Sequence, residues 1–270
     1  MLHRIAPVVT TSDVYSEAGF MSERTVTVEV TRYLSAPRLA PYLAEVGGDP
    51  AHALALYHWN LQLGSAFQEV LAVVEVVVRN AIDERLRAWN VTRGSDPAGL
   101  PYSTDWTLRP APPLSGLLRT ALGPATAHAK RAKASREPGH TRMHAPISHD
   151  DVLAQLSFSV WKKLLPPAAP GNPGRQKLWS NALVQAFPQQ GVPVANQSLR
   201  TPIENLVYDR MERLVSLRNR VAHMESLLQV NVPARLSDSL SLLAYVSPPT
   251  RDWCAGISRV TEVNAARPVR

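Results

Sequence analysis

The stretch Val207–His223 reads VYDRMERLVSLRNRVAH and lies within the longest amphipathic segment of the chain, residues 202–228. On a helical wheel at about 100° per residue, its apolar side chains gather into one stripe formed by Met211, Leu214, Val215, Val221 and Ala222. Spacing of three and four residues predicts an α-helix that buries one face.

Helical spacing recurs along the rest of the chain. It begins at Tyr33, and a second long run extends from Asp49 to about Trp89, which Gly64 and Ser65 are expected to divide into two helices. In its second half the apolar residues repeat every three or four positions, at Phe67, Val70, Leu71, Val74, Val78, Ile82 and Leu86. This part is predicted to be a helix buried nearly all round.

Further helices are expected at residues 114–134, from His149 through Trp161, at 176–187 and at 235–245. Alternation typical of a strand occurs only at Thr25–Val30. The predicted fold class is therefore all-α, a multi-helix bundle.

Composition excludes several classes of protein. The 270-residue chain is 45% hydrophobic and has one cysteine, so disulfide scaffolds and cysteine-based zinc modules are excluded. The longest apolar run, Leu71–Val78, is interrupted by Glu75 and is far shorter than the roughly 20 residues that cross a bilayer. No membrane span and no secretory signal are predicted, and the cytoplasm is the expected compartment. The net charge of +7 favours a polyanionic partner.

The chain is expected to divide into three parts. Residues 1–32 form a tail that is disordered or holds a short strand, residues 33–255 form the helical domain, and residues 256–270 form a second tail. Within the domain, residues 91–149 are rich in proline and contain Lys130, Arg131 and Lys133. This region is expected to be a basic loop region with one helix, inserted between the N-terminal and C-terminal helices.

Two charged residues lie where apolar ones are expected. Arg218 falls near the centre of the apolar stripe and needs an acidic partner, a phosphate ligand or a subunit interface. Glu75 lies in a valine run with Arg79 four residues later. We hypothesise one network of Glu75, Arg79 and Arg218; the alternative is a structural Glu75–Arg79 pair with Arg218 bound elsewhere. Asn219 and His223 share a second face of the helix. His223 lies about 140° from Arg218 on the wheel, so the side chains of Arg218 and His223 can converge only if the helix is distorted or if they come from two copies of the chain.

The run Arg218-Asn219-Arg220-Val221-Ala222-His223 resembles the R-x4-6-H motif, commonly R-N-x-x-x-H, of the HEPN superfamily of helical ribonucleases. Five further stretches resemble its Abi-like (abortive infection) branch: Tyr33-Leu34-Ser35 with Arg38-Leu39; Leu56-Tyr57 with Trp59-Asn60; Glu75 with Val78-Arg79-Asn80-Ala81; Leu156-Ser157-Phe158 with Trp161; and Leu178-Trp179 with Phe187-Pro188. The resemblance covers roughly residues 33–255. It departs at His223-Met224-Glu225, where Abi-like proteins often have His-His-Glu.

The resemblance implies an endoribonuclease that cleaves RNA without a metal or cofactor, in phage defence, as an abortive-infection effector or the toxin of a toxin–antitoxin pair. His223 would act as general base or acid, Arg218 would bind the phosphate, and Asn219 would orient either group. Glu75, Arg79 and Asn80 would support them, and the candidate RNA contacts are Lys130, Arg131, Lys133 and Arg220.

Because one motif supplies one imidazole, a homodimer with an isologous interface near the motif helix is expected. An antitoxin protein or RNA would be a further partner. The alternative function is a non-catalytic helical module that binds RNA or protein through its basic surface. His149, Asp150 and Asp151 are interpreted as a helix start rather than a metal site, because acidic residues favour that position.

Overall fold

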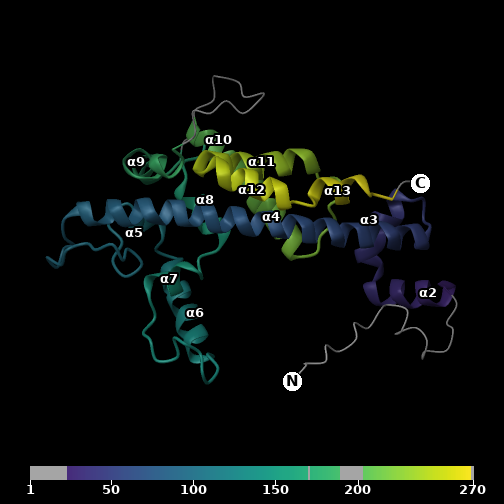
Figure 1. Cartoon of the computed structure of the whole chain (residues 1–270), viewed down its shortest axis with the longest axis horizontal. Coiled ribbons are helices and arrows are strands. Elements are labelled where there is room, and N and C mark those ends of the chain that lie inside the picture. The colour runs from purple at the N-terminus through teal and green to yellow at the C-terminus, as the bar shows by residue number, and fades with distance from the viewer. Residues whose placement is uncertain (1–22, 170, 189–202, 269–270) are drawn as a thin grey trace, which may run out of the picture. The chain divides into compact units, whose positions relative to one another are not determined.

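The computed structural model describes residues 23–169, 171–188 and 203–268 (Figure 1). These residues form helices and no strand, and an isolated bridge between Ser95 and Pro101 is the β-type pairing present among them. The all-α prediction is confirmed. Residues 1–22 of the predicted N-terminal tail, and Pro202, lie outside the described residues.

The chain forms two compact units, and the boundary between them falls inside helix α4 (Pro50–Asn90), between Gln62 and Leu63. The first unit contains α2 (Glu23–Leu34), α3 (Ala36–Glu45), the start of α4 and the segment from Ala265. Its buried side chains are Leu39, Tyr42, Ala53, Leu56 and Trp59. The guanidinium of Arg267 lies 5.1 Å from the Trp59 ring centroid and 2.8 Å from the Glu45 carboxylate, and so attaches the C-terminal segment to this unit.

Thr25–Val30, predicted to be a short strand or disordered, lies instead in α2, which packs on α3. β-branched residues favour a strand chiefly when a neighbouring strand pairs with them, and the described part of the chain offers none.

The second unit runs from Leu63 to Asn264. Its elements after α4 are η1 (Val91–Arg93), α5 (Leu114–Leu117), α6 (Leu122–Ala134), α7 (His149–Leu153), α8 (Phe158–Leu164), α9 (Pro173–Asn181), η2 (Leu183–Ala186), α10 (Ile203–Ala222), α11 (Val232–Val246), α12 (Pro248–Ile257) and α13 (Val260–Ala265). Helix α12 packs on α11, α11 on α10, and α10 on α8, whereas α6 packs on α7. In Figure 1, α6 and α7 lie below α4, whereas α11 and α12 lie above it.

Helix α4 supplies the centre of this second core. All seven of its predicted core positions between Phe67 and Leu86 are buried. Two expectations were wrong: the helix continues through Gly64 and Ser65, and it is not buried all round, since Val76 is 43% exposed with Ala72 and Asn80 exposed beside it. A glycine costs a helix interior only about 1 kcal/mol, which is small beside the burial of Leu63 and Ala66 on either side.

Other predicted helices differ in their boundaries. The helix expected from His149 through Trp161 is two short ones, because Ser157 begins α8 in an extended conformation. The helix expected at 114–134 is divided into α5 and α6, and the C-terminal tail expected at 256–270 contains the end of α12 and all of α13.

One continuous helical run, Pro50–Arg93, is long and apolar enough to span a membrane by length and composition alone. This criterion admits up to two charged residues among 18, whereas the expectation of no span considered only uninterrupted apolar runs. The long core helix of a soluble protein meets the same criterion, so this finding assigns no location.

Candidate functional site

The motif residues lie at the C-terminal end of α10. His223 follows the last helical residue, and its backbone N–H donates to the Asn219 carbonyl at 2.9 Å. The N–H groups of Met224 and Glu225 then donate to Val221 and Arg220, the pattern of a Schellman cap. Met224 has φ 53°, the left-handed conformation that glycine usually supplies at this position. The imidazole of His223 is therefore carried on an exposed, capped helix end.

Arg218 points to a different environment. It is half-buried, and its charge, with that of Arg79, acts on the carboxylate of Glu75, which also accepts the backbone N–H of Phe158 at the start of α8. Burial raises the pKa of Glu75, and these three groups lower it by less, so the pKa lies above its ordinary value. The charges of Arg218 and Arg79 therefore both act on Glu75, and the single network of the three residues stays a hypothesis.

Asn80 has a smaller part than expected, since it accepts a hydrogen bond from the Arg79 Nε at 3.2 Å and is exposed. The prediction that Arg218 is buried was also inexact: the buried arginine of α10 is Arg210, and Ala222, assigned to the apolar stripe, is exposed.

Within one chain, the structure does not bring Arg218 and His223 together on one face. Helix α10 keeps regular hydrogen bonding to its end, so the two side chains leave the axis about 140° apart. Arg220, three residues before His223, is only about 60° from it on the same wheel. The arginine on the histidine's side of the helix is therefore Arg220.

The four candidate RNA contacts belong to two helices. Lys130, Arg131 and Lys133 lie in α6, which packs on α7, and Arg220 lies in α10, which packs on α8 and α11. Lys130, Arg131 and Arg220 are exposed, and Lys133 is half-buried.

A cluster of arginines that the sequence analysis did not identify lies between α10 and α11. Arg213 binds Asp238 with two hydrogen bonds, from Nε at 2.8 Å and from Nη2 at 2.7 Å. Arg235 approaches the same carboxylate at 3.2 Å and Arg210 at 3.8 Å, and Asp238 is 7% exposed. A polar signal was present in the sequence, since Asp238 interrupts the apolar pattern of α11.

Beside this cluster is a cavity of about 480 Å³. Its lining comes from the last turns of α10, the connection 229–231 and the first turn of α11, and three of its residues are arginines, Arg213, Arg220 and Arg235. We call it the arginine cavity.

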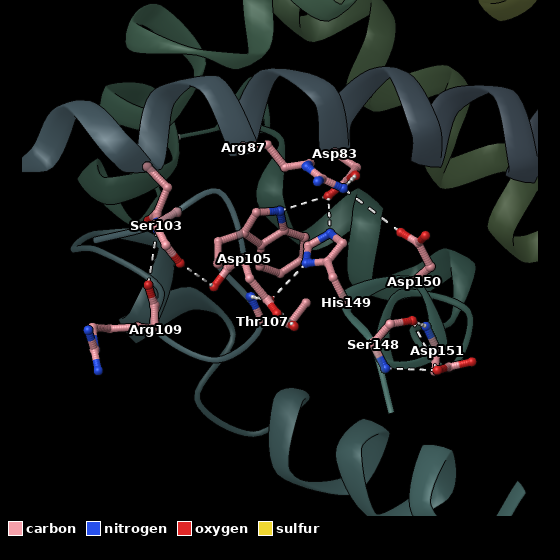
Figure 2. A network of polar contacts seen from close by, with 12 residues as sticks. Asp83, Arg87, Ser103, Asp105, Thr107, Arg109, Ser148, His149, Asp150 and Asp151 are labelled. Atoms are coloured by element: carbon pink, nitrogen blue, oxygen red, sulfur yellow. Dashed lines mark hydrogen bonds and ion pairs between the residues drawn. The ribbon is translucent and has the colours of Figure 1, made fainter. Parts of the chain in front are cut away.

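A second polar cluster joins α4, the loop after it and α7 (Figure 2). The Nε2 of His149 lies 2.7 Å from Asp83 and its Nδ1 lies 2.9 Å from Asp105. The indole of Trp106 donates to Asp83 at 2.8 Å. Burial lowers the pKa of His149, but the two carboxylates outweigh it and raise the pKa above its ordinary value, because an imidazole with a carboxylate on each nitrogen is stabilised as the imidazolium.

The polar groups around this histidine cluster also have hydrogen-bond partners. Asn90, fully buried, donates to the carbonyls of Ser103 and Arg109 and accepts the N–H of Ala111, which fixes the loop on the end of α4. Ser148 and Asp151 form a capping box at the start of α7, as the helix-start interpretation of this segment expects. Burial opposes the ionisation of Asp151, but Arg142 and Ser148 lower its pKa to about 2.

No protein-family model, curated protein or solved structure matches the chain. In the described ranges, no three His, Cys, Asp or Glu side chains are grouped so that they could hold a metal ion.

Proposed function

We propose that the chain is a metal-independent endoribonuclease of HEPN type that acts in the cytoplasm in phage defence, as an abortive-infection effector or as a toxin restrained by an antitoxin protein or RNA. The observation that carries the proposal is the exposed imidazole of His223 at the capped end of α10, with Arg220 beside it and the arginine cavity at the same helix end.

The residues suit cleavage by the 2′-hydroxyl of RNA. His223 takes the proton of the 2′-OH, the O2′–P bond forms, the P–O5′ bond breaks, and a second imidazole gives a proton to the leaving 5′-oxygen. A guanidinium stabilises the charge on the phosphorane. The products are a 2′,3′-cyclic phosphate and a 5′-hydroxyl, and DNA is not cut because it lacks the 2′-OH.

A homodimer completes this scheme. Each chain provides one motif histidine, and a two-fold axis near the end of α10 supplies the second from the other copy. The same axis would allow Arg218 of one chain to approach His223 of the other, which the about 140° separation within one helix prevents.

That separation also favours a second candidate function. A module that binds RNA through its basic surface without cutting it needs no convergence of Arg218 and His223, and in one chain the two lie on different sides of α10.

Cleavage of a 5′-labelled RNA in EDTA tests the proposal, with His223→Ala and Arg218→Ala compared with the parent. We expect His223→Ala to slow cleavage by about 100-fold or more, the usual contribution of a general acid or base. His128→Ala, which removes an exposed histidine of α6, is the matched control and should cleave like the parent. If both motif variants stay folded and cut RNA as fast as the parent, the site assignment is wrong. If the parent binds RNA but leaves it intact, the non-catalytic module replaces the ribonuclease.

A further inference from the structure

The arginine cavity has more positive charge than its neighbours neutralise. Arg210, Arg213 and Arg235 all make their ion pairs with one carboxylate, Asp238. Arg220 reaches the cavity from the last turn of α10 and donates to the carbonyl of Ser226 at 3.2 Å. Three guanidiniums thus share the carboxylate of Asp238, and Arg220 adds a fourth positive charge. The more distant carboxylate of Asp209 also acts on Arg213, but among the described residues it makes no ion pair there.

The acidic residue at the cavity edge does not correct this excess. Glu212 lines the cavity, but its carboxylate receives the ammonium of Lys162 and the hydroxyl of Tyr208. Its charge is therefore already matched by a cation from α8.

Crowding of like charges is visible at Arg235. Burial lowers its pKa, Asp238 raises it, and the neighbouring charge of Arg213 lowers it again, so the net effect is a pKa below its ordinary value. Arginine stays protonated at any physiological pH, so this crowding is relieved by a counter-anion rather than by loss of a proton. The start of α11, whose dipole favours negative charge, adds to the positive potential at the cavity.

We propose that the arginine cavity binds a phosphodiester group of single-stranded RNA, with Arg213, Arg220 and Arg235 as its ligands. Guanidinium groups match the oxygens of a phosphate in pairs, and the cavity is open to solvent along the side chain of Arg213, which is 39% exposed. Arg220 holds the RNA backbone on the side of α10 from which His223 leaves, about one helical turn away.

The inference rests on the proposed function for the cleavage of the bound RNA. It assigns different tasks to the two arginines of the motif, Arg218 and Arg220. Arg220 becomes a substrate-positioning residue. Arg218, which is half-buried, lowers the pKa of Glu75 and so opposes the larger effect of burial on that carboxylate.

Binding of a 2′-O-methyl RNA oligonucleotide tests the inference, since such RNA cannot be cleaved by its own 2′-oxygen. Fluorescence anisotropy is measured with the full chain at several salt concentrations. Arg220→Gln removes a charge from an exposed side chain that has no ion pair within the described residues, so the fold should persist. We expect Kd to rise about tenfold, the usual weight of a charged hydrogen bond, and the salt slope to fall by about 0.7 for the lost phosphate contact.

Arg119→Gln is the matched control, because Arg119 is also exposed and also without an ion pair in the described residues, but it follows α5, which packs on α8 and α9, and it does not line the arginine cavity. Its Kd should change less than about twofold, as expected for a screened charge outside the site. Equal effects of the two variants would mean that RNA responds only to net charge and would overturn the inference. Unchanged binding by Arg220→Gln would overturn it as well.

The two proposals fail separately. If Arg220→Gln weakens binding of 2′-O-methyl RNA while the parent never cuts unmodified RNA, the cavity assignment stands and the ribonuclease does not. If cleavage depends on His223 while Arg220→Gln binds like Arg119→Gln, the ribonuclease stands and the cavity assignment is wrong.

Discussion

The histidine cluster around His149 and the arginine cluster around Asp238 are built from similar groups but differ in how their charges balance. His149 lies between the carboxylates of Asp83 and Asp105, and Arg87 lies 3.9 Å from Asp83 and 3.9 Å from the exposed Asp150, so each positive charge has at least one carboxylate beside it. Around Asp238, three guanidiniums meet one carboxylate and the cluster borders a cavity. A balanced cluster stabilises the fold by itself, whereas an unbalanced one needs a partner from outside. We therefore interpret the first as structural and the second as a binding site.

Removing His149 should have the largest effect on stability. His149→Ala leaves the carboxylates of Asp83 and Asp105 without their shared cation, and loss of one partner in a buried pair costs about 3–5 kcal/mol. Urea denaturation measures the change in free energy of unfolding. Asp150→Ala, next in the chain with a side chain 78% exposed, is the control and should cost less than about 1 kcal/mol. Equal losses would show that the cluster has no special structural weight.

Removing the single carboxylate from the arginine cluster tests whether this cluster, unlike the histidine cluster, binds an anion. Asp238→Asn leaves three guanidiniums unmatched and should lower the free energy of unfolding by about 2–3 kcal/mol, the weight of charged hydrogen bonds. Inorganic phosphate should restore more of this loss than sodium chloride at equal ionic strength, because the anion takes the place of the carboxylate.

Asp151→Asn serves as the control for that variant, since Asp151 also pairs with two arginines, Arg136 and Arg142, but does not line the arginine cavity. Its stability should not respond specifically to phosphate. If phosphate rescues neither variant, or both to the same extent, the charge excess at Asp238 does not define an anion site.

The pH dependence of stability should also distinguish the clusters. The folded pKa of His149 is raised, so its contribution is complete below the unfolded pKa of about 6.5 and is lost as pH rises through the folded pKa. The parent should therefore lose stability above neutral pH, and His149→Ala should lose less over the same interval. The arginines of the cavity do not titrate there. Thermal unfolding from pH 6 to pH 9 measures the difference, and parallel curves for parent and variant would contradict the assignment.

The smallest expected effect concerns the end of α10. Met224 adopts a positive φ that glycine tolerates better, so Met224→Gly should stabilise the chain by about 1 kcal/mol. Ala222→Gly, inside the last helical turn, should instead destabilise it by about 0.5–1 kcal/mol. Both are measured by thermal unfolding. A loss of stability in Met224→Gly would mean that contacts of the methionine side chain outweigh its backbone strain.

Local patterns in the sequence were enough to predict the elements that depend on periodicity. The spacing from Phe67 to Leu86 identified the buried face of α4, and Ser148 with Asp151 lies at the predicted helix start. The hypothesis that Glu75 and Arg218 interact came from the same kind of pattern, because each is a charged residue within an apolar segment. Continuity of α4 through Gly64 was not predicted, since packing on both sides outweighs a weak local preference.

The two polar clusters could not be assembled from the sequence. His149 meets Asp83 across 66 residues and Asp105 across 44, and Arg213 meets Asp238 across 25. No local rule links such positions, because the helices that carry them are brought together by tertiary packing. What the sequence does show is the anomaly itself: Asp83 and Asn90 are seven residues apart on the buried face of α4, and Asp238 interrupts α11.

We propose above all that the arginine cavity, with its excess of positive charge, binds RNA beside His223. Side-chain Nε–H signals of the arginines, followed by NMR as 2′-O-methyl RNA is added to the full chain, test it most directly. We expect the signals of Arg213, Arg220 and Arg235 to shift first, with those of Arg119 and Arg131 unchanged at the same RNA concentration. Shifts confined to Arg119 and Arg131, with the three cavity arginines unmoved, would contradict the account.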